Sequence, residues 1–392
     1  MTKRALLLLT ASLLWAPAMA AEKDLPGQRF SLSATSLPAP YATPGVDNHS
    51  TTVTRPAGAL PQVPKGFAVE PYVTGLSSPR FMALGPNGDV FLTESSAGKI
   101  TLIRGGKASL FANGFKTPSG IAFHDGALYV GDLEAVWRID LKTKARTRIT
   151  QDDFGGTGGH STRDIAFAPD GTLYLAIGSA SNVSEEKAPR ATVQVVDKAG
   201  HMKTFASGTR NPVGIAFYPG SNTLFVTVNE RDGLGDGLPP DYLTSLKQND
   251  FLGWPYAYTG KHPDPEYGPK RPDLVARTKV PDVLFQAHSA PLGLVFYDGS
   301  QFPAAYKNSA FIALHGSWDA AKPTGFKVVR VGFKDGKPEN GYENFVTGFW
   351  SEGLEPPKVW GRPAGLLVDK DGSLLIADDT GKTVWRVRYT GP

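Results

Sequence analysis

Polar side chains that could move a proton or bind a charged ligand recur at equivalent positions of a repeated pattern in this sequence. When the repeats are aligned on the apolar centre of each first strand, five such residues stand four to six positions earlier: His160, Arg210, Asn211, His288 and Arg362. Histidine accepts a proton near neutral pH, and the arginine guanidinium binds carboxylates in a bidentate manner. The set predicts a site for acid–base chemistry that also binds an anionic group.

Further polar residues stand where the second strand of each repeat ends. They are Glu94, Asp132, Ser179, Asn229 with Glu230 and Arg231, His315, and Asp378 with Asp379. In an antiparallel pair, the start of the first strand and the end of the second lie on the same side, because the hairpin turn is on the other. Both sets of residues are therefore predicted to meet at one mouth of a common channel.

The elements that must position these residues are short strands in six copies of one pattern. Each copy has an apolar strand, a tight turn and a second apolar strand, and the copies begin at Pro79, Pro118, Thr162, Asn211, Ala290 and Arg362. Such repetition predicts an all-β fold, a six-bladed β-propeller over residues 65–392. Long loops, chiefly residues 232–288 and 300–308, are expected on the ligand face. A seven-bladed propeller is the alternative if residues 234–283 contain a degenerate copy of the pattern.

The N-terminal region is predicted to consist of a signal peptide and an arm. Residues 1–20 combine Lys3 and Arg4, an apolar stretch and a small-residue cleavage site at Ala20, so we expect an exported protein, periplasmic or secreted. Residues 21–64 are rich in Pro, Ala, Ser and Thr and are predicted to form an extended arm without chemistry. No later stretch reaches the roughly 20 apolar residues of a membrane-spanning helix.

Composition excludes several classes of chemistry. The chain has no cysteine, which excludes disulfides, zinc–thiolate sites and haem attached through a Cys-x-x-Cys-His motif. Redox chemistry would therefore need a dissociable cofactor, because the side chains are poor two-electron carriers. The 41 Lys and Arg residues face 37 Asp and Glu residues, and this balance gives no indication of nucleic-acid binding.

Seven short motifs occur in a characteristic order. They are residues 159–163 (GHSTR), 210–214 (RNPVG), 229–232 (NERD), 253–255 (GWP), 287–293 (AHSAPLG), 315–318 (HGSW) and 360–363 (WGRP). This series resembles the soluble quinoprotein sugar dehydrogenases, with the L-sorbosone and pyranose dehydrogenases as the nearest branch, from about Gly66 to the C-terminus. The resemblance implies a six-bladed propeller that holds pyrroloquinoline quinone (PQQ) and calcium at its axial mouth, oxidises a sugar and passes electrons to an external acceptor.

The resemblance also implies roles for single residues. His160 would be the general base, grouped with Arg163 and Asp164; Asp164 would orient or charge-tune His160 or Arg163, or make a purely structural hydrogen bond. The implied cofactor-binding set is Arg210, Asn211, Asn229, His288, His315, Arg362 and Asp378, in which His315 and Arg362 hold the cofactor carboxylates. Asn229 leads into the calcium loop, where the backbone carbonyls of Glu230 and Arg231 would bind the ion.

Two other functions stay open. A calcium-dependent lactonase is also a six-bladed propeller, in which side-chain carboxylates bind the metal and a hydroxide attacks the ester; Glu94, Asp132, Asp378 and Asp379 are the candidate carboxylates for it. The third possibility is an exported propeller that binds a ligand without catalysis. An absorbance scan of protein reconstituted with PQQ and calcium would separate the three.

Overall fold

The structure is a computed structural model that describes residues 24–391. It contains 42% strand and 3% helix, which confirms the predicted all-β class. The helical turns of the described part are η1 (Gly268–Lys270), α1 (Pro272–Arg277) and η2 (Ala304–Tyr306). None of these described helices is long and apolar enough to span a membrane. The predicted signal peptide, residues 1–20, lies outside the described residues.

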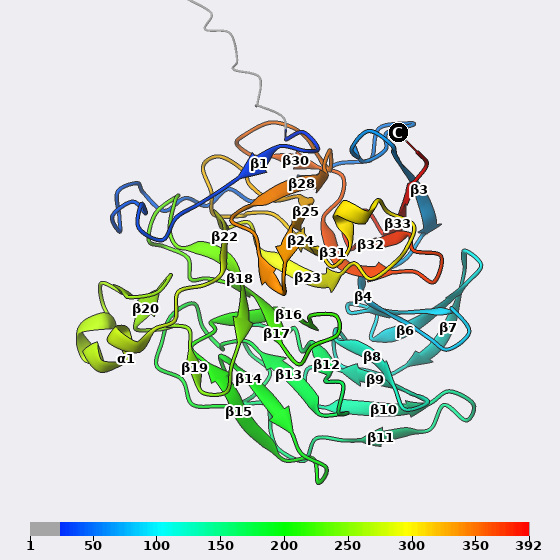
Figure 1. Cartoon of the computed structure of the whole chain (residues 1–392), viewed down its shortest axis with the longest axis horizontal. Helices are drawn as coiled ribbons and strands as arrows, with labels where there is room; N and C mark the ends of the chain where they lie inside the picture. The colour runs from blue at the N-terminus through cyan, green and yellow to red at the C-terminus, as the bar shows by residue number, and fades with distance from the viewer. Residues whose placement is uncertain (1–23, 392) are drawn as a thin grey trace, which may run out of the picture.

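Six sheets with at least four strands each contain most of the strand residues of the described chain (Figure 1). Sheet 1 contains β4 (Pro79–Leu84), β5 (Val90–Glu94), β6 (Lys99–Arg104) and β7 (Lys107–Asn113); sheet 2 contains β8 (Ile121–His124), β9 (Ala127–Gly131), β10 (Val136–Asp140) and β11 (Arg146–Arg148). Sheet 3 contains β12 (Ile165–Phe167), β13 (Leu173–Ile177), β14 (Thr192–Val196) and β15 (Met202–Ser207), with β19 (Asp250–Phe251) at its edge.

The other three large sheets follow in chain order. Sheet 4 contains β16 (Asn211–Phe217), β17 (Leu224–Asn229), β18 (Pro240–Leu246) and β22 (Val283–Ala287). Sheet 5 contains β23 (Pro291–Phe296), β24 (Ala310–Leu314), β25 (Lys327–Val331) and β28 (Tyr342–Val346), with β1 (Arg29–Phe30) at its edge. Sheet 6 contains β31 (Pro363–Val368), β32 (Leu374–Asp378), β33 (Thr383–Tyr389) and β3 (Phe67–Thr74).

Three small sheets lie in the loops of the described chain. They are β20 (Ala257–Tyr258) with β21 (His262–Pro263), β26 (Phe333–Lys334) with β27 (Lys337–Pro338), and β2 (Thr51–Thr52) with β30 (Lys358–Val359) and β29 (Trp350–Glu352). The first of these and α1 belong to the long insertion between β18 and β22. Two of these small sheets therefore lie in insertions between strands of the same large sheet, sheet 4 or sheet 5.

A tight turn with an Asp-Gly pair joins the first two strands of sheet 2, whereas the corresponding connection in sheet 5, between β23 and β24, is longer and contains η2. Between β8 and β9, His124 pairs with Ala127 across a two-residue loop. Its central residues, Asp125 and Gly126, have φ values of 43° and 71°. Two consecutive residues in the left-handed region match the right-handed twist of the flanking strands, and Asp and Gly are among the residues that adopt it most readily.

The first strands of the six sheets contact one another in succession around a common centre. Strand β4 contacts β8, and the series continues through β12, β16, β23 and β31, which in turn contacts β4 (Figure 1). The backbones approach so closely there that side chains are excluded at certain positions. A Cβ atom on Gly365 would lie 1.9 Å from the carbonyl oxygen of Arg80, and one on Gly214 would lie 2.3 Å from that of Leu292. This crowding explains the glycine just before the apolar residues of several repeats.

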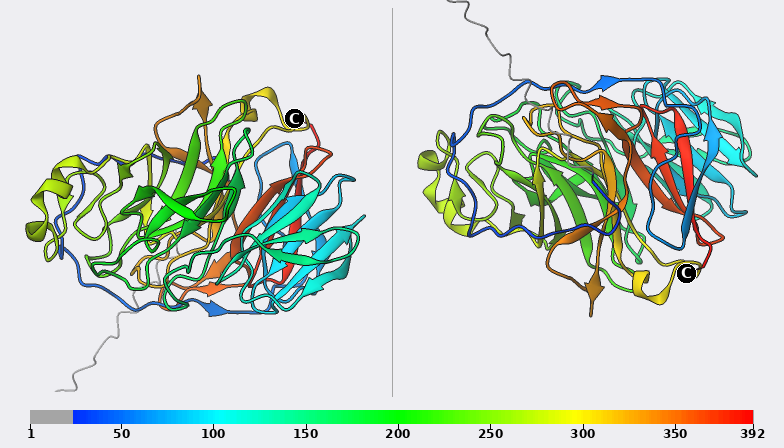
Figure 2. Two further views of the ribbon diagram at one scale, coloured as in Figure 1. Left: turned by 90° about the horizontal axis from the view of Figure 1, so that it is seen from below. Right: turned by 90° about the horizontal axis from the view of Figure 1, so that it is seen from above.

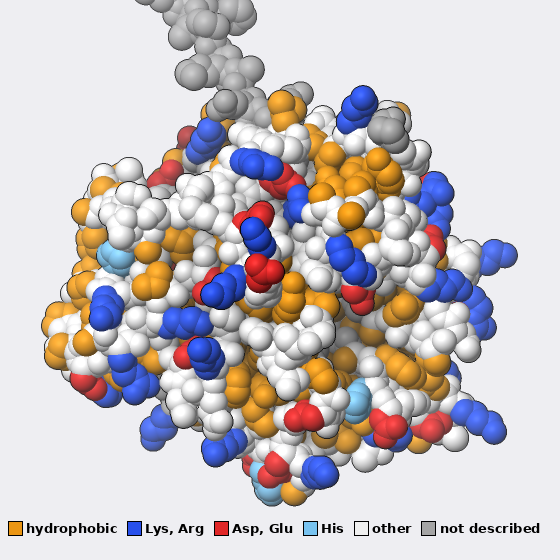
Figure 3. All heavy atoms as spheres, in the orientation of Figure 1, with side chains coloured by type: hydrophobic (Ala, Val, Ile, Leu, Met, Phe, Trp, Pro, Cys, Tyr) orange, Lys and Arg blue, Asp and Glu red, His pale blue; other side chains and the backbone are white. Residues whose placement is uncertain are grey.

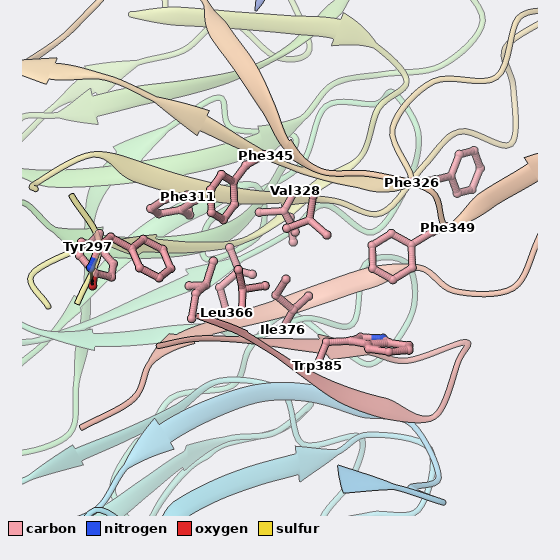
Figure 4. Packing of buried hydrophobic residues seen from close by; sticks show 14 of the residues in the cluster. Tyr297, Phe311, Phe326, Val328, Phe345, Phe349, Leu366, Ile376 and Trp385 are labelled. Atoms are coloured by element: carbon pink, nitrogen blue, oxygen red, sulfur yellow. Dashed lines mark hydrogen bonds between the residues drawn. The ribbon is translucent and has the colours of Figure 1, made fainter. Parts of the chain in front are cut away.

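The hydrophobic core lies between neighbouring sheets. Between sheets 5 and 6, aromatic and aliphatic side chains interdigitate (Figure 4), among them Phe311, Phe345, Leu366, Ile376 and Trp385. The rings of Phe311 and Phe345 lie 4.7 Å apart in an edge-to-face arrangement. Each fully buried side chain of this size contributes about 1.5–3 kcal/mol of hydrophobic free energy. The sheets therefore form a rigid frame for the loops at their ends.

The described part of the N-terminal arm, residues 24–64, runs along the outside of the sheets as an extended chain (Figure 2). Strand β1 pairs with β28, β2 pairs with β30, and Gln62 forms a bridge with Thr347. On the face shown in Figure 3, acidic and basic side chains are interspersed. Through the pairings of β1, β2 and Gln62, the arm is bound to sheet 5, to the chain at Thr347 and to the small sheet that contains β30.

Candidate functional site

A polar cavity of about 290 Å³ opens where the strands of sheets 3, 4 and 5 begin and end. It is lined by His160, Arg210, Asn211, Asn229, Glu230, Asp232, Asp241, His288, Ala290, Trp318 and Asp319. Six of the residues predicted from the sequence are thereby brought together: His160, Arg210, Asn211, Asn229, Glu230 and His288. They meet because strand starts and strand exits lie on the same side of each sheet, as the hairpin argument requires.

His160 presents one free ring nitrogen at the cavity. Its Nδ1 lies 2.9 Å from the carbonyl oxygen of Ser179, which can only accept a hydrogen bond, so Nδ1 carries the proton and Nε2 keeps a lone pair. Nε2 makes no hydrogen bond within residues 24–391. Burial, with the nearby charge of Arg210, lowers the pKa of His160 from 6.5 to about 3. The imidazole is therefore neutral at physiological pH.

Arg210 is buried and binds several acceptors around the cavity. Its Nε donates to the Asn182 carbonyl at 3.1 Å, and its Nη1 donates to the Glu230 carbonyl at 2.6 Å. Its Nη2 donates to the side chains of Asn182 and Asp232, at 3.0 and 2.9 Å. The guanidinium thus fixes the loop after β17 and places a positive charge at the cavity wall.

Two amide side chains continue the wall between sheets 4 and 5. Asn211 Nδ2 donates to Asn229 Oδ1 at 3.3 Å, and Asn229 Nδ2 donates to the Pro291 carbonyl at 2.6 Å. Asn211 Oδ1 is buried and has no hydrogen-bond partner among the described residues. A buried unpaired acceptor is costly, so this oxygen is available to a donor on a ligand.

The carboxyl groups of Glu230 and Asp241 lie side by side in the cavity wall. Asp241 Oδ1 accepts the Glu230 backbone N–H at 2.8 Å, and Asp241 Oδ2 accepts that of Ala290 at 2.8 Å. Burial raises the pKa of Glu230 to about 8 and that of Asp241 to about 7. Arg231, by contrast, turns its guanidinium away to an ion pair with Asp264.

Asp232, His288 and Asp319 form an acidic corner of the cavity. His288 Nδ1 lies 2.8 Å from Asp319 Oδ2, and His288 Nε2 lies 3.1 Å from the Gly235 carbonyl. Burial opposes a charge on His288, but the hydrogen bond and charge of Asp319 outweigh it and raise the pKa to about 9. Asp232 lies 2.9 Å from Arg210.

A second polar group, made of Arg80, His315, Arg362 and Asp379, lies outside the lining of this cavity. His315 Nε2 is 3.0 Å from both Asp379 oxygens, and Arg80 Nη1 is 3.0 Å from Oδ2. Burial opposes the charge of Asp379, but His315 and the two arginines hold its pKa well below the usual range. The group adjoins the cavity, because the His315 N–H donates to the Ala290 carbonyl at 2.9 Å. The predicted cofactor ligands are thus divided between two neighbouring sites.

Two predicted site residues, Asp378 and Asp164, are used by the fold and do not line the cavity. Asp378 accepts the backbone N–H groups of Arg362 and Gly381, each at 2.7 Å, and the Trp385 indole at 3.1 Å. Asp164 accepts the N–H groups of Ile165 and Ile215, both at 2.9 Å. The contacts that both carboxylates make are structural, which for Asp164 is the structural alternative.

Arg163 also differs from its predicted catalytic role. It is fully buried, and its Nη1 donates to the carbonyls of His160 and Thr162 at 2.8 and 2.9 Å. It positions the backbone of His160 and has no access to the cavity. The position of Arg163 at the end of a predicted strand placed its backbone near the cavity. That position could not predict the direction of its side chain.

The arm holds the loop that carries Trp318 and Asp319 in the cavity wall. The Asn48 N–H donates to the Trp318 carbonyl at 2.7 Å, and its side-chain amide donates to the carbonyls of Ala320 and Leu354 at 2.9 and 2.8 Å. The ring of His49 stacks on Trp318 at 5.2 Å. Sequence analysis assigned no chemistry to this arm, and it missed Asp232, Asp241 and Asp319. The sequence offered a signal only for Asp232, because this residue follows Arg231 in the motif at residues 229–232.

Comparison with known proteins agrees with this geometry. Residues 131–317 match the family model described as "Glucose / Sorbosone dehydrogenase", and residues 273–390 match one described as "TrAA12-like". The chain is related to the glucose/sorbosone dehydrogenases. This relation confirms the resemblance found in the sequence motifs.

Individual relatives of these dehydrogenases extend the comparison. A pyrroloquinoline quinone-dependent pyranose dehydrogenase of Coprinopsis cinerea is 26% identical over 88% of this chain, which spans 57% of that protein's length. The solved PQQ domain of the C. cinerea pyranose dehydrogenase superposes with a TM-score of 0.69 at 19% identity, over 86% of this chain and 98% of that one. A PQQ-bound aldose sugar dehydrogenase of Streptomyces coelicolor gives 0.60 at 18% identity, over 83% and 99%. These structures share the fold.

Proposed function

We propose that this protein is an exported PQQ-dependent dehydrogenase that oxidises a sugar or ketoaldose, with His160 as the general base. The observation that carries the proposal is the free Nε2 of a neutral, buried His160 in a cavity that it shares with Arg210 and Asn211. The cavity-lining residues from His160 to Ala290 lie within the residues that match the dehydrogenase family. The six large sheets are interpreted as six blades, with the cavity at the axial mouth.

The residues present fit PQQ, which is a flat quinone with carboxylate groups. Arg210 and Asn211 would lie at the quinone end, where the unpaired Asn211 Oδ1 could also accept a hydrogen bond from a substrate hydroxyl. Arg80 and Arg362 would hold the carboxylates, because their group carries two guanidinium charges against the one carboxylate of Asp379. When bound, PQQ would supply the two-electron acceptor that no side chain provides.

His160 would accept the proton of the substrate hydroxyl at Nε2. The hydrogen bond from Nδ1 to the Ser179 carbonyl fixes the tautomer, and Arg163 holds the backbone of the same residue. The lowered pKa makes His160 a weak base in the resting enzyme, but it keeps the imidazole unprotonated over the whole physiological range. The hydroxyl becomes more acidic as hydride leaves the neighbouring carbon, so the base is required only in the transition state.

The test is reconstitution of chelator-treated protein with PQQ, followed by absorbance and by a panel of aldoses and ketoaldoses with a dye as acceptor. We expect saturable PQQ binding and sugar oxidation that is absent without PQQ. Arg362→Ala should weaken PQQ binding, whereas Arg104→Ala should not, because Arg104 pairs with Asp89 at the hairpin end of sheet 1. Equal activity with and without PQQ after exhaustive dialysis would refute the proposal.

A lactonase remains the second candidate because four carboxyl groups line the cavity: Glu230, Asp232, Asp241 and Asp319. The carboxylates that sequence analysis considered for such a metal cage are engaged elsewhere. Glu94 accepts the Ser77 N–H, and Asp132 accepts the N–H groups of Lys116, Glu134 and Ala135. Hydrolysis of a lactone panel by the metal-loaded protein without PQQ would favour the lactonase over the dehydrogenase.

A further inference from the structure

The acidic corner of the cavity has the composition of a metal site. Asp232, His288 and Asp319 each offer one ligand atom, and these three atoms lie within 4.8 Å of one another. They come from three separate loops, which follow β17, β22 and β24. His288 and Asp319 are buried, and all three residues line the cavity.

The hydrogen bonding of His288 requires a positive charge between its ring and Asp319. Nε2 lies 3.1 Å from the carbonyl oxygen of Gly235, so Nε2 carries a proton. Nδ1 then faces Asp319 Oδ2 at 2.8 Å. Two lone pairs at this distance repel each other unless a second proton or a metal ion neutralises them. Asp319 Oδ2 is buried and, apart from the His288 ring, has no hydrogen-bond partner among the described residues.

The charge of the surroundings leaves room for one further positive charge beside Asp319, which a proton on His288 or a metal ion can supply. Asp232 and Asp319 together carry two negative charges when ionised, and Arg210 neutralises one of them at 2.9 Å from Asp232. Glu230 also lines the cavity, and its buried Oε1 has no hydrogen-bond partner among the described residues. Buried carboxylates are normally paired or bound to a metal, so this surplus of acceptor oxygens points to a cation.

The calcium position implied by the family resemblance fits this chain less well. The carbonyl of Glu230 accepts Arg210 Nη1 at 2.6 Å, and that of Asn229 accepts the same atom at 3.5 Å. A divalent cation at these carbonyls would lie next to a guanidinium of the same sign. Of the two carbonyls predicted as metal ligands, that of Glu230 is thus already used by an arginine.

We propose that Asp232, His288 and Asp319 bind a divalent cation, and that this ion does not occupy the carbonyls of Glu230 and Arg231. Two carboxylates and an imidazole suit Mn²⁺ or Zn²⁺ better than Ca²⁺, which prefers oxygen ligands alone. Because the three side chains line the cavity, the bound ion would be accessible to a sugar hydroxyl. The site is inferred from these residues and does not depend on PQQ.

The test uses the full chain after chelation, without PQQ, titrated calorimetrically with MnCl₂, ZnCl₂ and CaCl₂. We expect one site that binds Mn²⁺ or Zn²⁺ more tightly than Ca²⁺. Asp319→Asn and His288→Gln should each weaken binding by at least roughly ten-fold. Asp152→Asn is the matched control, because Asp152 pairs with His201 in a similar Asp–His contact of 3.1 Å at the surface; it should leave the affinity unchanged.

Electron spin-echo spectroscopy of the Mn²⁺ form provides a readout that a folding defect does not imitate. The wild type should show nitrogen coupling from one imidazole, and folded His288→Gln should not. Absence of any site, or Ca²⁺ binding that is equal in wild type and both variants, would overturn the proposal in favour of a proton between His288 and Asp319 or of carbonyl coordination. If the metal binds here and sugar oxidation fails, the dehydrogenase proposal alone is refuted.

Discussion

Replacing His160 by Asn should remove a specific part of the protein's sensitivity to acid. The Asn amide can keep the hydrogen bond that Nδ1 makes to the Ser179 carbonyl but has no proton to gain. In the wild type, the pKa of His160 falls from 6.5 to about 3 on folding. The unfolded chain therefore binds more protons below pH 6.5, and wild-type stability is lost as the pH falls.

The magnitude follows from linkage between protonation and folding. One pH unit below 6.5 costs about 1.4 kcal/mol, so His160 alone should destabilise the wild type by about 2 kcal/mol between pH 7 and pH 5. Urea unfolding of the wild type and of His160→Asn at pH 7 and pH 5 gives the change in unfolding free energy of each protein between the two pH values. Subtracting the change of the variant from that of the wild type isolates the contribution of His160. The unfolding free energy of the variant should fall by about 2 kcal/mol less than that of the wild type between pH 7 and pH 5. Its turnover with PQQ and sugar should fall roughly 10²–10⁴-fold.

His201→Asn is the control for the acid-sensitivity experiment. The hydrogen bond to Asp152 raises the pKa of His201, so its contribution to stability is present at low pH and is lost as the pH rises. Its removal should change the pH dependence in the opposite direction. If His160→Asn loses as much stability as the wild type between pH 7 and pH 5, then His160 is not held neutral by burial and the derivation of its role as a base fails.

Three further outcomes test other parts of the structure. Asn48→Ala should raise KM more than it lowers kcat in steady-state sugar kinetics, because it frees the loop that carries Trp318 without touching His160; an unchanged KM would contradict the positioning role of the arm. Gly365→Ala should lower the melting temperature sharply or prevent folding, since its Cβ would lie 1.9 Å from the Arg80 carbonyl. Asp164→Asn should cost about 1–3 kcal/mol in chemical unfolding, because one backbone N–H would then face an amide donor; full stability would show that these two hydrogen bonds are not needed.

The fold was predictable from the sequence because the repeat is a local pattern. The Asp125-Gly126 turn and the apolar strands around it depend only on residues that are close in sequence. Because each turn reverses the chain, the start of the first strand and the end of the second lie on the same side of the sheet. That reasoning located His160, Arg210 and Asn211 correctly at one cavity. The same pattern determines the position of a backbone, but it does not determine which groups a side chain will bind.

The limits of the prediction follow from that distinction. Asp378 and Asp164 stand at the predicted strand ends, yet buried backbone N–H groups nearby must be paired, and these carboxylates accept them. Asp241 and Asp319 lie outside the aligned strand ends, where the repeats offer no register that could place them. Their contribution to the cavity depends on tertiary contacts, including those from the arm at Asn48.

The pairing of β3 with β33 has a consequence for how the chain folds. Residues 67–74 align with residues 383–389, so a strand from near the start of the described chain must find its partner near the end. Sheet 6 is incomplete until the C-terminal strand is available, and β3 presents an unpaired edge during that interval. Contacts so distant in sequence slow folding, because the loop must close before the pairing is gained. A chain that ends before β33 should therefore be prone to aggregation, and a circular permutant that joins β33 directly to β3 should fold faster than the natural order.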